Sequence, residues 1–256
     1  MKLQNKTTLI TGASAGIGMS CAYKFAEEGS NLVLFARRID KLEQVAKDIE
    51  SKYGVKIFYS KLDVRKFDDV KNTIASLPDD FSKIDILINN AGKALGLSKF
   101  YDADLDDWEE MIDTNIKGLL YLSRVIVPKM VERNSGFIIN IGSLAGHEVY
   151  PNGNVYCATK SFVRAISKGM IIDLNGTNVR VTNIDPGLVE TEFSEVRFHG
   201  DKEKAKGVYL GYTPLTGNDI ADIAVFAATR PQHVQIQEIF VTPTDQATAT
   251  IVNKKL

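Results

Sequence analysis

Excess positive charge, closely spaced histidines and long apolar runs are all missing from this sequence of 256 residues. Its 31 Lys and Arg residues balance 32 Asp and Glu residues, so it has no basic field of the kind that nucleic-acid binding needs. The three histidines, His147, His199 and His233, show no paired ligand spacing, which argues against a metal site. No apolar run approaches the roughly 20 residues that cross a bilayer. We therefore expect no nucleic acid, metal or membrane among its partners.

Cysteine is equally scarce, with only Cys21 and Cys157, and both fall in segments with helical periodicity. Two cysteines far apart in the sequence suit free, packed thiols in a reducing compartment better than a disulfide. The N-terminus leads into a strand-like run without the charged and apolar succession of a signal peptide. We expect a cytoplasmic protein. With 44% hydrophobic residues, the chain can bury the core of a single domain.

The sequence does contain a glycine-rich turn between a strand and a helix. The run at residues 7–11 is strand-like, and helical periodicity extends from the turn to about residue 28. Glycines at this place let the backbone approach a pyrophosphate, which the N–H groups of a helix N-terminus bind. A tight connection between strand and helix is the alternative. The candidate cofactor contacts in the turn are Gly12, Ser14, Gly16, Ile17 and Gly18.

Two arginines follow the second predicted strand, residues 31–36, where an acidic residue would bind the ribose 2′-hydroxyl of NAD. Ala36 stands at that place, and Arg37 and Arg38 come directly after it. Arginine suits the 2′-phosphate of NADP, and the hydroxyl of Ser14 is a further donor. The alternative is that both arginines only begin the next helix in solvent. We predict a preference for NADP(H).

Small and polar residues also follow the third and fourth predicted strands, residues 56–62 and 84–89. After the third strand, Asp63 and the backbone N–H of Val64 are placed to hold an adenine edge, although Asp63 would also suit the N-cap of the next helix. After the fourth strand, Asn90, Ala91 and Gly92 allow backbone and cofactor to approach closely. All five are candidate cofactor contacts.

A proton relay is predicted from the strand that ends near residue 142 and the helix at about residues 154–174. Ser143 lies where the strand opens into a loop, and Tyr156 and Lys160 are four residues apart on one helical face. A nearby ammonium lowers the pKa of a phenol, so Tyr156 is a candidate general acid and base, with Ser143 as a second hydrogen-bond partner of the reacting oxygen. A common surface pair is the alternative for Tyr156 and Lys160.

Asn115 is a polar residue within an apolar helical segment at residues 105–133. A buried amide needs hydrogen-bond partners. Asn115 is therefore either a satisfied core amide or a group that holds a water or a backbone carbonyl in a proton path.

Seven predicted strands alternate with helices, without repeats or linkers. That alternation predicts an α/β fold, a Rossmann-type, doubly wound, parallel seven-stranded sheet flanked by helices. We expect one domain over residues 1–256. The weakly periodic segment at about residues 191–213 is predicted to be a mobile substrate lid, with a disordered excursion as the alternative.

Together these motifs resemble the short-chain dehydrogenase/reductase family over about residues 7–241. The family's glycine motif matches residues 11–18, and its Asn-Asn-Ala-Gly matches residues 89–92. Its helix asparagine and its Ser, Tyr and Lys fall on Asn115, Ser143, Tyr156 and Lys160. The loop that contacts the nicotinamide in the family falls on Pro186, Gly187, Val189 and Thr191. The resemblance implies an NADP(H)-dependent oxidoreductase that interconverts a hydroxyl and a carbonyl.

Residues 89–96 and 186–198 are similar to NADP-dependent 3-hydroxy acid dehydrogenases, which act on L-allo-threonine, serine and related hydroxy acids. That similarity implies a homotetramer joined by paired long helices, residues 105–133 and 154–174 here. A substrate carboxylate would need a cation, and Lys93 and Arg197 are the candidates. The alternatives are an NADPH-dependent reductase of other ketones or aldehydes, and a redox sensor that binds NADP without turnover.

Overall fold

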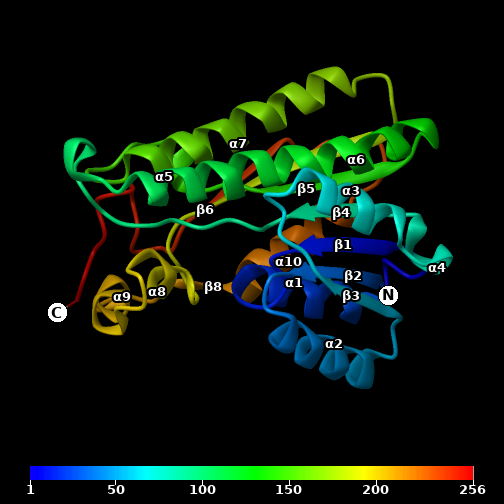
Figure 1. Ribbon diagram of the computed structural model, residues 1–256, viewed down its shortest axis with the longest axis horizontal. Coiled ribbons are helices and arrows are strands. Elements are labelled where there is room, and N and C mark those ends of the chain that lie inside the picture. The colour runs from blue at the N-terminus through cyan, green and yellow to red at the C-terminus, as the bar shows by residue number, and fades with distance from the viewer. Residues whose placement is uncertain (256) are drawn as a thin grey trace.

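The computed structural model describes residues 1–255, and its centre is a seven-stranded sheet with the strand order β3-β2-β1-β4-β5-β6-β9 (Figure 1). The strands are β1 (Thr7–Thr11), β2 (Asn31–Ala36), β3 (Ile57–Lys61), β4 (Ile86–Asn89), β5 (Gly136–Ile141), β6 (Val179–Pro186) and β9 (Glu238–Val241). All neighbouring pairs in this sheet run parallel, so each connection crosses over a face of the sheet. The predicted Rossmann-type, doubly wound sheet is confirmed.

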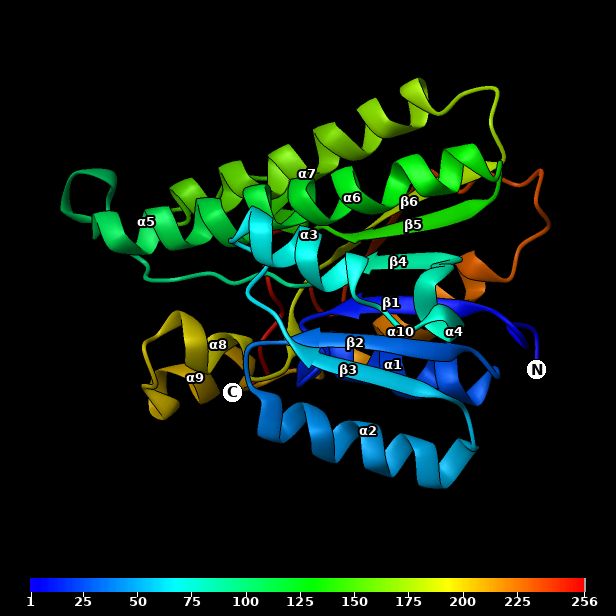
Figure 2. The same ribbon diagram turned by 45° about the vertical axis from the view of Figure 1, so that its right-hand side comes forward.

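Helices cover both faces because successive residues of a strand point to opposite sides. On β1, Ile10 belongs to the core cluster with α1 (Gly16–Glu27), α2 (Ile39–Tyr53) and α10 (Gly217–Ala228). Its neighbour Leu9 belongs to the cluster with α3 (Phe67–Ala75) and α6 (Gly118–Glu132), beside which α7 (Asn154–Asp173) lies. Figure 2 shows these two groups of helices on opposite sides of the sheet. The short α4 (Asp79–Ser82) precedes β4.

The strand order reverses between β1 and β4, and the loops that leave these strands diverge there. The hydroxyl of Thr11 accepts the backbone N–H groups of Asn90 at 3.1 Å and Ala91 at 3.0 Å. The side chain of Asn90 donates in return to the carbonyl of Thr11 at 2.8 Å. Ligands of open parallel sheets bind in the crevice at such a reversal. The fold therefore brings two of the predicted cofactor motifs to one crevice.

The predicted long helix at residues 105–133 is not uniform. It consists of α5 (Leu105–Ile112), a π-helical turn η2 (Asp113–Lys117) and α6. Single π-helical turns inside helices are frequent at functional sites, and Asn115 lies in this one. The predicted long helical segment is therefore confirmed, while the π-helical turn within it was not predicted, because hydrophobic periodicity does not register one inserted residue.

The predicted lid has regular structure, so the alternative of a disordered excursion is wrong. β7 (Val189–Glu190) pairs with β8 (Leu215–Thr216), and α8 (Phe193–Arg197) and α9 (Lys202–Tyr209) lie between them. Both helices are drawn in yellow beside the carboxyl ends of the strands in Figure 1. The hydroxyl of Tyr209 donates to the carbonyl of Val189 at 3.0 Å and ties the segment together.

Cys21 and Cys157 are both buried and free, as predicted. Burial raises the pKa of the Cys21 thiol to about 12, as expected for a cysteine that serves only in packing. Throughout residues 1–255, none of the helices combines the length and apolar character that a membrane span requires.

Candidate active site

A cavity of about 520 Å³ opens at the carboxyl ends of the strands and collects most of the predicted site residues. The predicted residues that line it come from seven segments of the chain: Gly12, Ser14, Gly16, Ile17, Arg37, Arg38, Asp63, Val64, Asn90, Ala91, Gly92, Lys93, Ser143, Tyr156, Lys160, Pro186, Gly187, Val189, Thr191 and Arg197. Gly18 and Asn115 lie behind the wall of the cavity rather than in it. One continuous space therefore joins the glycine turn to the residues of the predicted proton relay.

Gly18 is required by packing rather than by direct contact with a ligand. A Cβ at this position would lie 2.4 Å from the side-chain nitrogen of Asn90 and 2.5 Å from the carbonyl oxygen of Gly12. Gly12 itself has φ +66°, a left-handed conformation that favours glycine. The helix can therefore start close behind the turn, with its N–H groups facing the cavity.

Arg38 and Ser14 meet at one rim of the cavity, as the NADP hypothesis requires. The guanidinium of Arg38 donates to the hydroxyl of Ser14 at 3.4 Å and to the carboxylate of Glu192 at 2.6 Å. Lys41 donates to the other oxygen of Glu192 at 2.7 Å. Glu192 precedes α8, and both basic side chains hold its pKa below the usual range. Lys41 and Glu192 were not predicted from the sequence, because Glu192 is about 150 residues from both Lys41 and Arg38 in the chain.

Asp63 lines the cavity but is not the N-cap of α3, a position that Lys66 occupies. Its carboxylate accepts from the guanidinium of Arg65 at 2.7 Å and 2.9 Å, which lowers its pKa. Arg65 also contacts Glu110 at 3.2 Å. This arrangement holds the carboxylate ionised at the cavity wall, and the N-cap alternative is wrong.

Lys93 is already paired. Its ammonium donates to the carboxylate of Glu110, and its side chain is buried. That contact is the largest cause of the lowered pKa of Glu110. Although Lys93 lines the cavity, its charge is neutralised within the protein, which makes it the weaker of the two candidates for a substrate carboxylate.

Tyr156 and Lys160 are buried in the cavity wall one helical turn apart, so the surface-pair alternative is wrong. Their exposed fractions are 8% and 6%. The ammonium of Lys160 donates to the carbonyl of Ile141 at 2.9 Å, which joins α7 to the end of β5. Ser143 follows β5 and caps the short turn η3 (Leu144–Gly146), where its hydroxyl accepts the N–H of Ala145 at 3.1 Å.

Burial dominates the protonation of this pair. It raises the pKa of the Tyr156 phenol, and the two largest opposing effects are the charge of Arg197 and a hydrogen bond with Ser143. Burial lowers the pKa of Lys160 to about 8, and the charge of Asp185 works against that shift. From the sequence, Lys160 alone was expected to lower the pKa of the phenol. In the structure the larger cationic contribution comes from Arg197, 41 positions along the chain.

The side chain of Asn115 is a buried amide whose oxygen and nitrogen both have partners, and one of these partners is a backbone carbonyl, so its contacts fit both alternatives. Its oxygen accepts the N–H of Lys93 at 2.9 Å, and its nitrogen donates to the Lys93 carbonyl at 2.8 Å and the Thr159 hydroxyl at 3.0 Å. These bonds fix the loop after β4 against α7. A Cβ on Gly92 would lie 3.3 Å from the Asn115 oxygen and 3.6 Å from the Lys160 nitrogen, so Gly92 stands directly beside both groups.

Arg197 from α8 lines the cavity over the ring of Tyr156. Its guanidinium carbon lies 4.9 Å from the ring centroid of Tyr156 and 5.2 Å from that of Phe193. One terminal nitrogen donates to the hydroxyl of Tyr150 at 2.8 Å, while the buried Nε has no partner. Within residues 1–255, Arg197 forms no ion pair with a carboxylate. It is therefore a cation that faces the cavity without a counter-charge.

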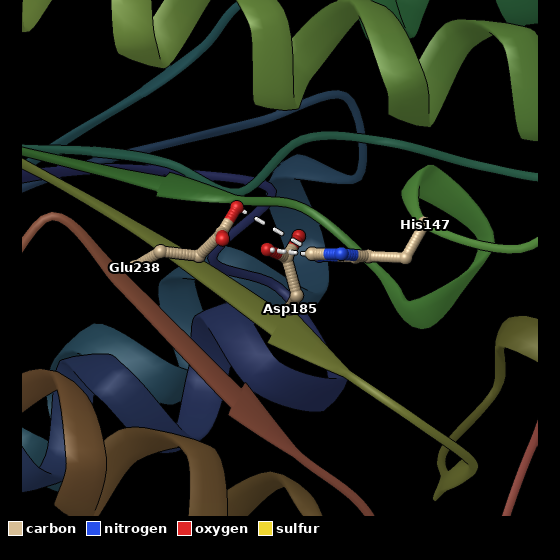
Figure 3. Close-up of side chains that lie close together, drawn as sticks. All are labelled: His147, Asp185 and Glu238. Carbon is tan, nitrogen blue, oxygen red and sulfur yellow. Dashed lines mark hydrogen bonds and ion pairs between the residues drawn. The ribbon is translucent and has the colours of Figure 1, made fainter.

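The fold also brings together His147, Asp185 and Glu238, which sequence spacing gave no reason to group (Figure 3). The oxygens of Asp185 already face the Ser143 N–H, the Asn183 amide and the His147 ring. Glu238 accepts from the guanidinium of Arg164 at 2.9 Å. Protein donors therefore occupy the places that a cation would take.

Comparisons with known proteins agree with this geometry. Residues 6–202 match the family model described as short chain dehydrogenase. The NADP-dependent 3-hydroxy acid dehydrogenase of Schizosaccharomyces pombe is 46% identical over 99% of this chain and 98% of that protein. The NADP-dependent 3-hydroxy acid dehydrogenase YdfG of Escherichia coli is 45% identical over 94% of this chain and 96% of that protein.

Solved structures are similar over nearly the whole chain. The closed form of a serine dehydrogenase complexed with NADP+ superimposes with a TM-score of 0.91 at 43% identity, covering 98% of this chain and 100% of that one. The serine dehydrogenase from Escherichia coli gives a TM-score of 0.82 at 41% identity, covering 94% and 99%.

Proposed function

This chain belongs to the short-chain dehydrogenase family, and on that premise we propose that it is an NADP-dependent oxidoreductase that interconverts a hydroxyl and a carbonyl on 3-hydroxy acids such as L-allo-threonine or serine. The family resemblance seen in the motifs is thereby confirmed. The observation that carries the proposal is that one cavity joins Arg37 and Arg38 at its rim to Tyr156 and Lys160 at its inner end.

NADP fits the residues that line this cavity. The glycine turn leaves room for a pyrophosphate at the N-terminus of α1, because side chains at Gly12 or Gly18 would collide with the neighbouring loop. Arg37, Arg38 and the Ser14 hydroxyl supply donors for a 2′-phosphate. Asp63 and Val64 would border the adenine, and the loops at residues 90–92 and 186–191 would hold the nicotinamide end. When bound, the nicotinamide supplies the group that gives or receives hydride.

The chain's own residues handle the proton. In oxidation, Tyr156 would accept the substrate's hydroxyl proton, and in reduction it would return a proton to the carbonyl oxygen. Ser143 would hydrogen-bond the same oxygen. The raised pKa keeps the phenol protonated and suited to the reductive direction. The nearby cations Arg197 and Lys160 favour the phenolate that oxidation needs. Tyr156 and Lys160 would also contact the cofactor, with Lys160 on its ribose, and Asn115 would order a water that links Lys160 to solvent.

Arg197 is the residue that we assign to the substrate's carboxylate. A carboxylate in the cavity would provide the counter-charge that Arg197 lacks, whereas Lys93 already has Glu110. Arg197 also lies over the Tyr156 ring, so a carboxylate on it would place the hydroxyl of a short acid near the phenol. The proposed specificity for short hydroxy acids rests on this placement.

The test is a set of assays of the purified protein that follow the absorbance of reduced nicotinamide. L-allo-threonine and L-serine should be oxidised with NADP+ and much more slowly with NAD+. The methyl ester of serine, which lacks the carboxylate, should be a poor substrate, and Arg197→Gln should reduce activity on the acid far more than on the ester. Turnover of neutral ketones with NADPH but not of hydroxy acids would favour the ketone reductase. Tight NADPH binding without any turnover would favour the redox sensor.

We also propose a homotetramer in the cytoplasm, with α5, α6 and α7 at the contacts between subunits. Leu105 on α5 and Ile172 on α7 are 67% and 64% exposed, which is compatible with contacts between subunits at these helices. Light scattering should give a mass about four times that of the 28.3 kDa chain. A monomeric mass would contradict this assignment.

A further inference from the structure

One buried carboxylate holds both ends of the turn that carries Ser143. Asp185 of β6 is fully buried, and its Oδ1 accepts the backbone N–H of Ser143 at 2.8 Å. Its Oδ2 lies 2.9 Å from Nε2 of His147, just beyond the other end of η3. Figure 3 shows His147 reaching from this turn to the Asp185 carboxylate. With the proton on Nε2, the His147 ring donates, and the carboxylate bridges the two ends.

The chain leaves no room for a side chain between the turn and this carboxylate. A Cβ on Gly142 would lie 1.9 Å from Oδ1 of Asp185. The N–H of Gly142 also donates to the carbonyl of Ile184 at 2.7 Å, so the backbone before Ser143 is fixed to the strand that carries Asp185. The backbone at residues 142–143 thus lies directly against the carboxylate.

The groups around Asp185 form a nearly balanced set of charges. The Asn183 amide on β6 donates to Oδ2 at 2.6 Å. Glu238 on β9 lies 3.7 Å from the His147 ring nitrogen and is itself bound by Arg164 from α7. On the cavity side, the negative charge of Asp185 favours the protonated form of Lys160. Asp185 is thus in contact with the turn and electrostatically coupled to the relay.

We propose that Asp185, with His147 as its partner, is a positioning residue that fixes the Ser143 turn so that the serine hydroxyl faces the phenol of Tyr156. This inference rests on the proposed function for its effect on turnover. Three N–H groups, from Ser143, Asn183 and His147, point at the two carboxylate oxygens. Only a side chain in which both terminal atoms accept hydrogen bonds can satisfy all three. An amide at position 185 would turn an NH₂ group toward one of these donors and release one end of the turn.

A double-mutant cycle tests whether Asp185 acts through Ser143. Asp185→Asn should lower kcat for hydroxy-acid oxidation by about ten- to a hundredfold, as expected from displacement of a group that contacts the reacting oxygen. The KM for NADP+ should stay within about twofold. In a Ser143→Ala background, the same substitution should change kcat by less than about twofold, because the group it positions is already absent. If the fold-decrease in kcat of the double variant equals the product of the two single decreases, the proposal is overturned.

Glu238→Gln is the matched control, because it makes the same change from carboxylate to amide beside His147 while both oxygens of Asp185 keep their donors. Its kcat should fall far less than that of Asp185→Asn. His147→Ala releases only the far end of the turn and should lower kcat a few-fold, with His147→Gln restoring part of the loss because its amide can donate to Asp185. These variants also test the proposal should Asp185→Asn fail to fold. A His147→Ala enzyme with wild-type kcat would overturn it.

Hydrogen exchange gives a readout that does not depend on turnover. The N–H of Ser143 should exchange faster in Asp185→Asn, while exchange in β1 and α10 stays unchanged. If the wild type oxidises no hydroxy acid, the proposed function fails, yet this measurement still decides whether Asp185 holds the turn. Unchanged exchange at residues 143–147 would show that it does not.

Discussion

The inner end of the cavity and its rim are built from different interactions. Tyr156, Lys160 and Asn115 at the inner end are at most 8% exposed, and buried neighbours bind or surround their polar groups. At the rim, Arg38 and Glu192 are 46% and 43% exposed and meet in an ion pair. Buried polar contacts are costly to break, whereas exposed ion pairs are worth little. The polar side chains at the inner end are therefore held in a fixed geometry. The ion-paired side chains at the rim can give up their partners for a ligand.

The largest effect should come from the inner end. Tyr156→Phe keeps the packing against Phe193 but removes the only proton that the phenol can transfer. Turnover should fall about a hundred- to ten-thousandfold, while NADPH affinity measured by fluorescence stays within a few-fold. Activity close to that of the wild type would show that Tyr156 does not transfer the proton. The inner end would then need no more precise a geometry than the rim.

Lys160→Met should stabilise the protein at neutral pH. The pKa of Lys160 is lowered from 10.5 to about 8, so between these values the unfolded chain binds more protons than the folded one. The charged lysine therefore destabilises the fold below about pH 8, and this cost is relieved as the pH rises to 10.5. Compared with the wild type, the variant should have a free energy of unfolding higher by on the order of 3 kcal/mol at pH 7. The difference should be small near pH 10.5.

Urea unfolding of both proteins at equal concentration, at neutral and at alkaline pH, measures this difference. A gain in stability that does not shrink as the pH rises would mean that the ammonium carries no burial cost. The variant should also be inactive. Lys160 would then be a residue that catalysis needs although it lowers the stability of the fold.

Arg38→Gln should change cofactor choice with little effect on the chemical step. The guanidinium would lose charge-assisted bonds to a 2′-phosphate, each worth about 1.5–3 kcal/mol. The KM for NADPH should rise roughly ten- to a hundredfold, with the KM for NADH nearly unchanged. Equal changes for both cofactors would contradict a role in binding the 2′-phosphate. Arg37→Gln tests the second arginine in the same way.

The smallest effect should come from Glu192→Gln. Glu192 holds Arg38 and Lys41 together at the rim, where a 2′-phosphate would compete for the same cations. Removing its charge should lower the KM for NADPH by no more than a few-fold, because exposed ion pairs contribute about 0.2–1 kcal/mol. The difference should shrink at high salt. A higher KM would indicate that Glu192 assists binding instead of competing.

The contrast between the two regions also explains what the sequence could predict. Ser143, Tyr156 and Lys160 could be singled out from the sequence as a candidate relay because helical spacing and the end of a strand are local patterns. The seven-stranded sheet follows from the alternation of apolar runs. Both signals are properties of neighbouring residues, and the structure reproduces most predicted element boundaries within one or two residues.

Partners distant in the sequence were not predictable in this way. Glu192 meets Arg38, Arg197 lies over Tyr156, and Glu110 pairs with Lys93 only because crossovers bring separate segments to one edge of the sheet. The π-helical turn around Asn115 was missed because one inserted residue hardly alters the apolar pattern.

We expect NADP to lie along this cavity with its nicotinamide beside Tyr156. A crystal structure of the NADP+ complex would show whether it does. We predict the 2′-phosphate on Arg37 and Arg38, the pyrophosphate at the N-terminus of α1, and the reactive face of the nicotinamide turned toward the Tyr156 hydroxyl. A dinucleotide bound elsewhere, or a nicotinamide turned away from Tyr156, would rule out hydride transfer beside this phenol.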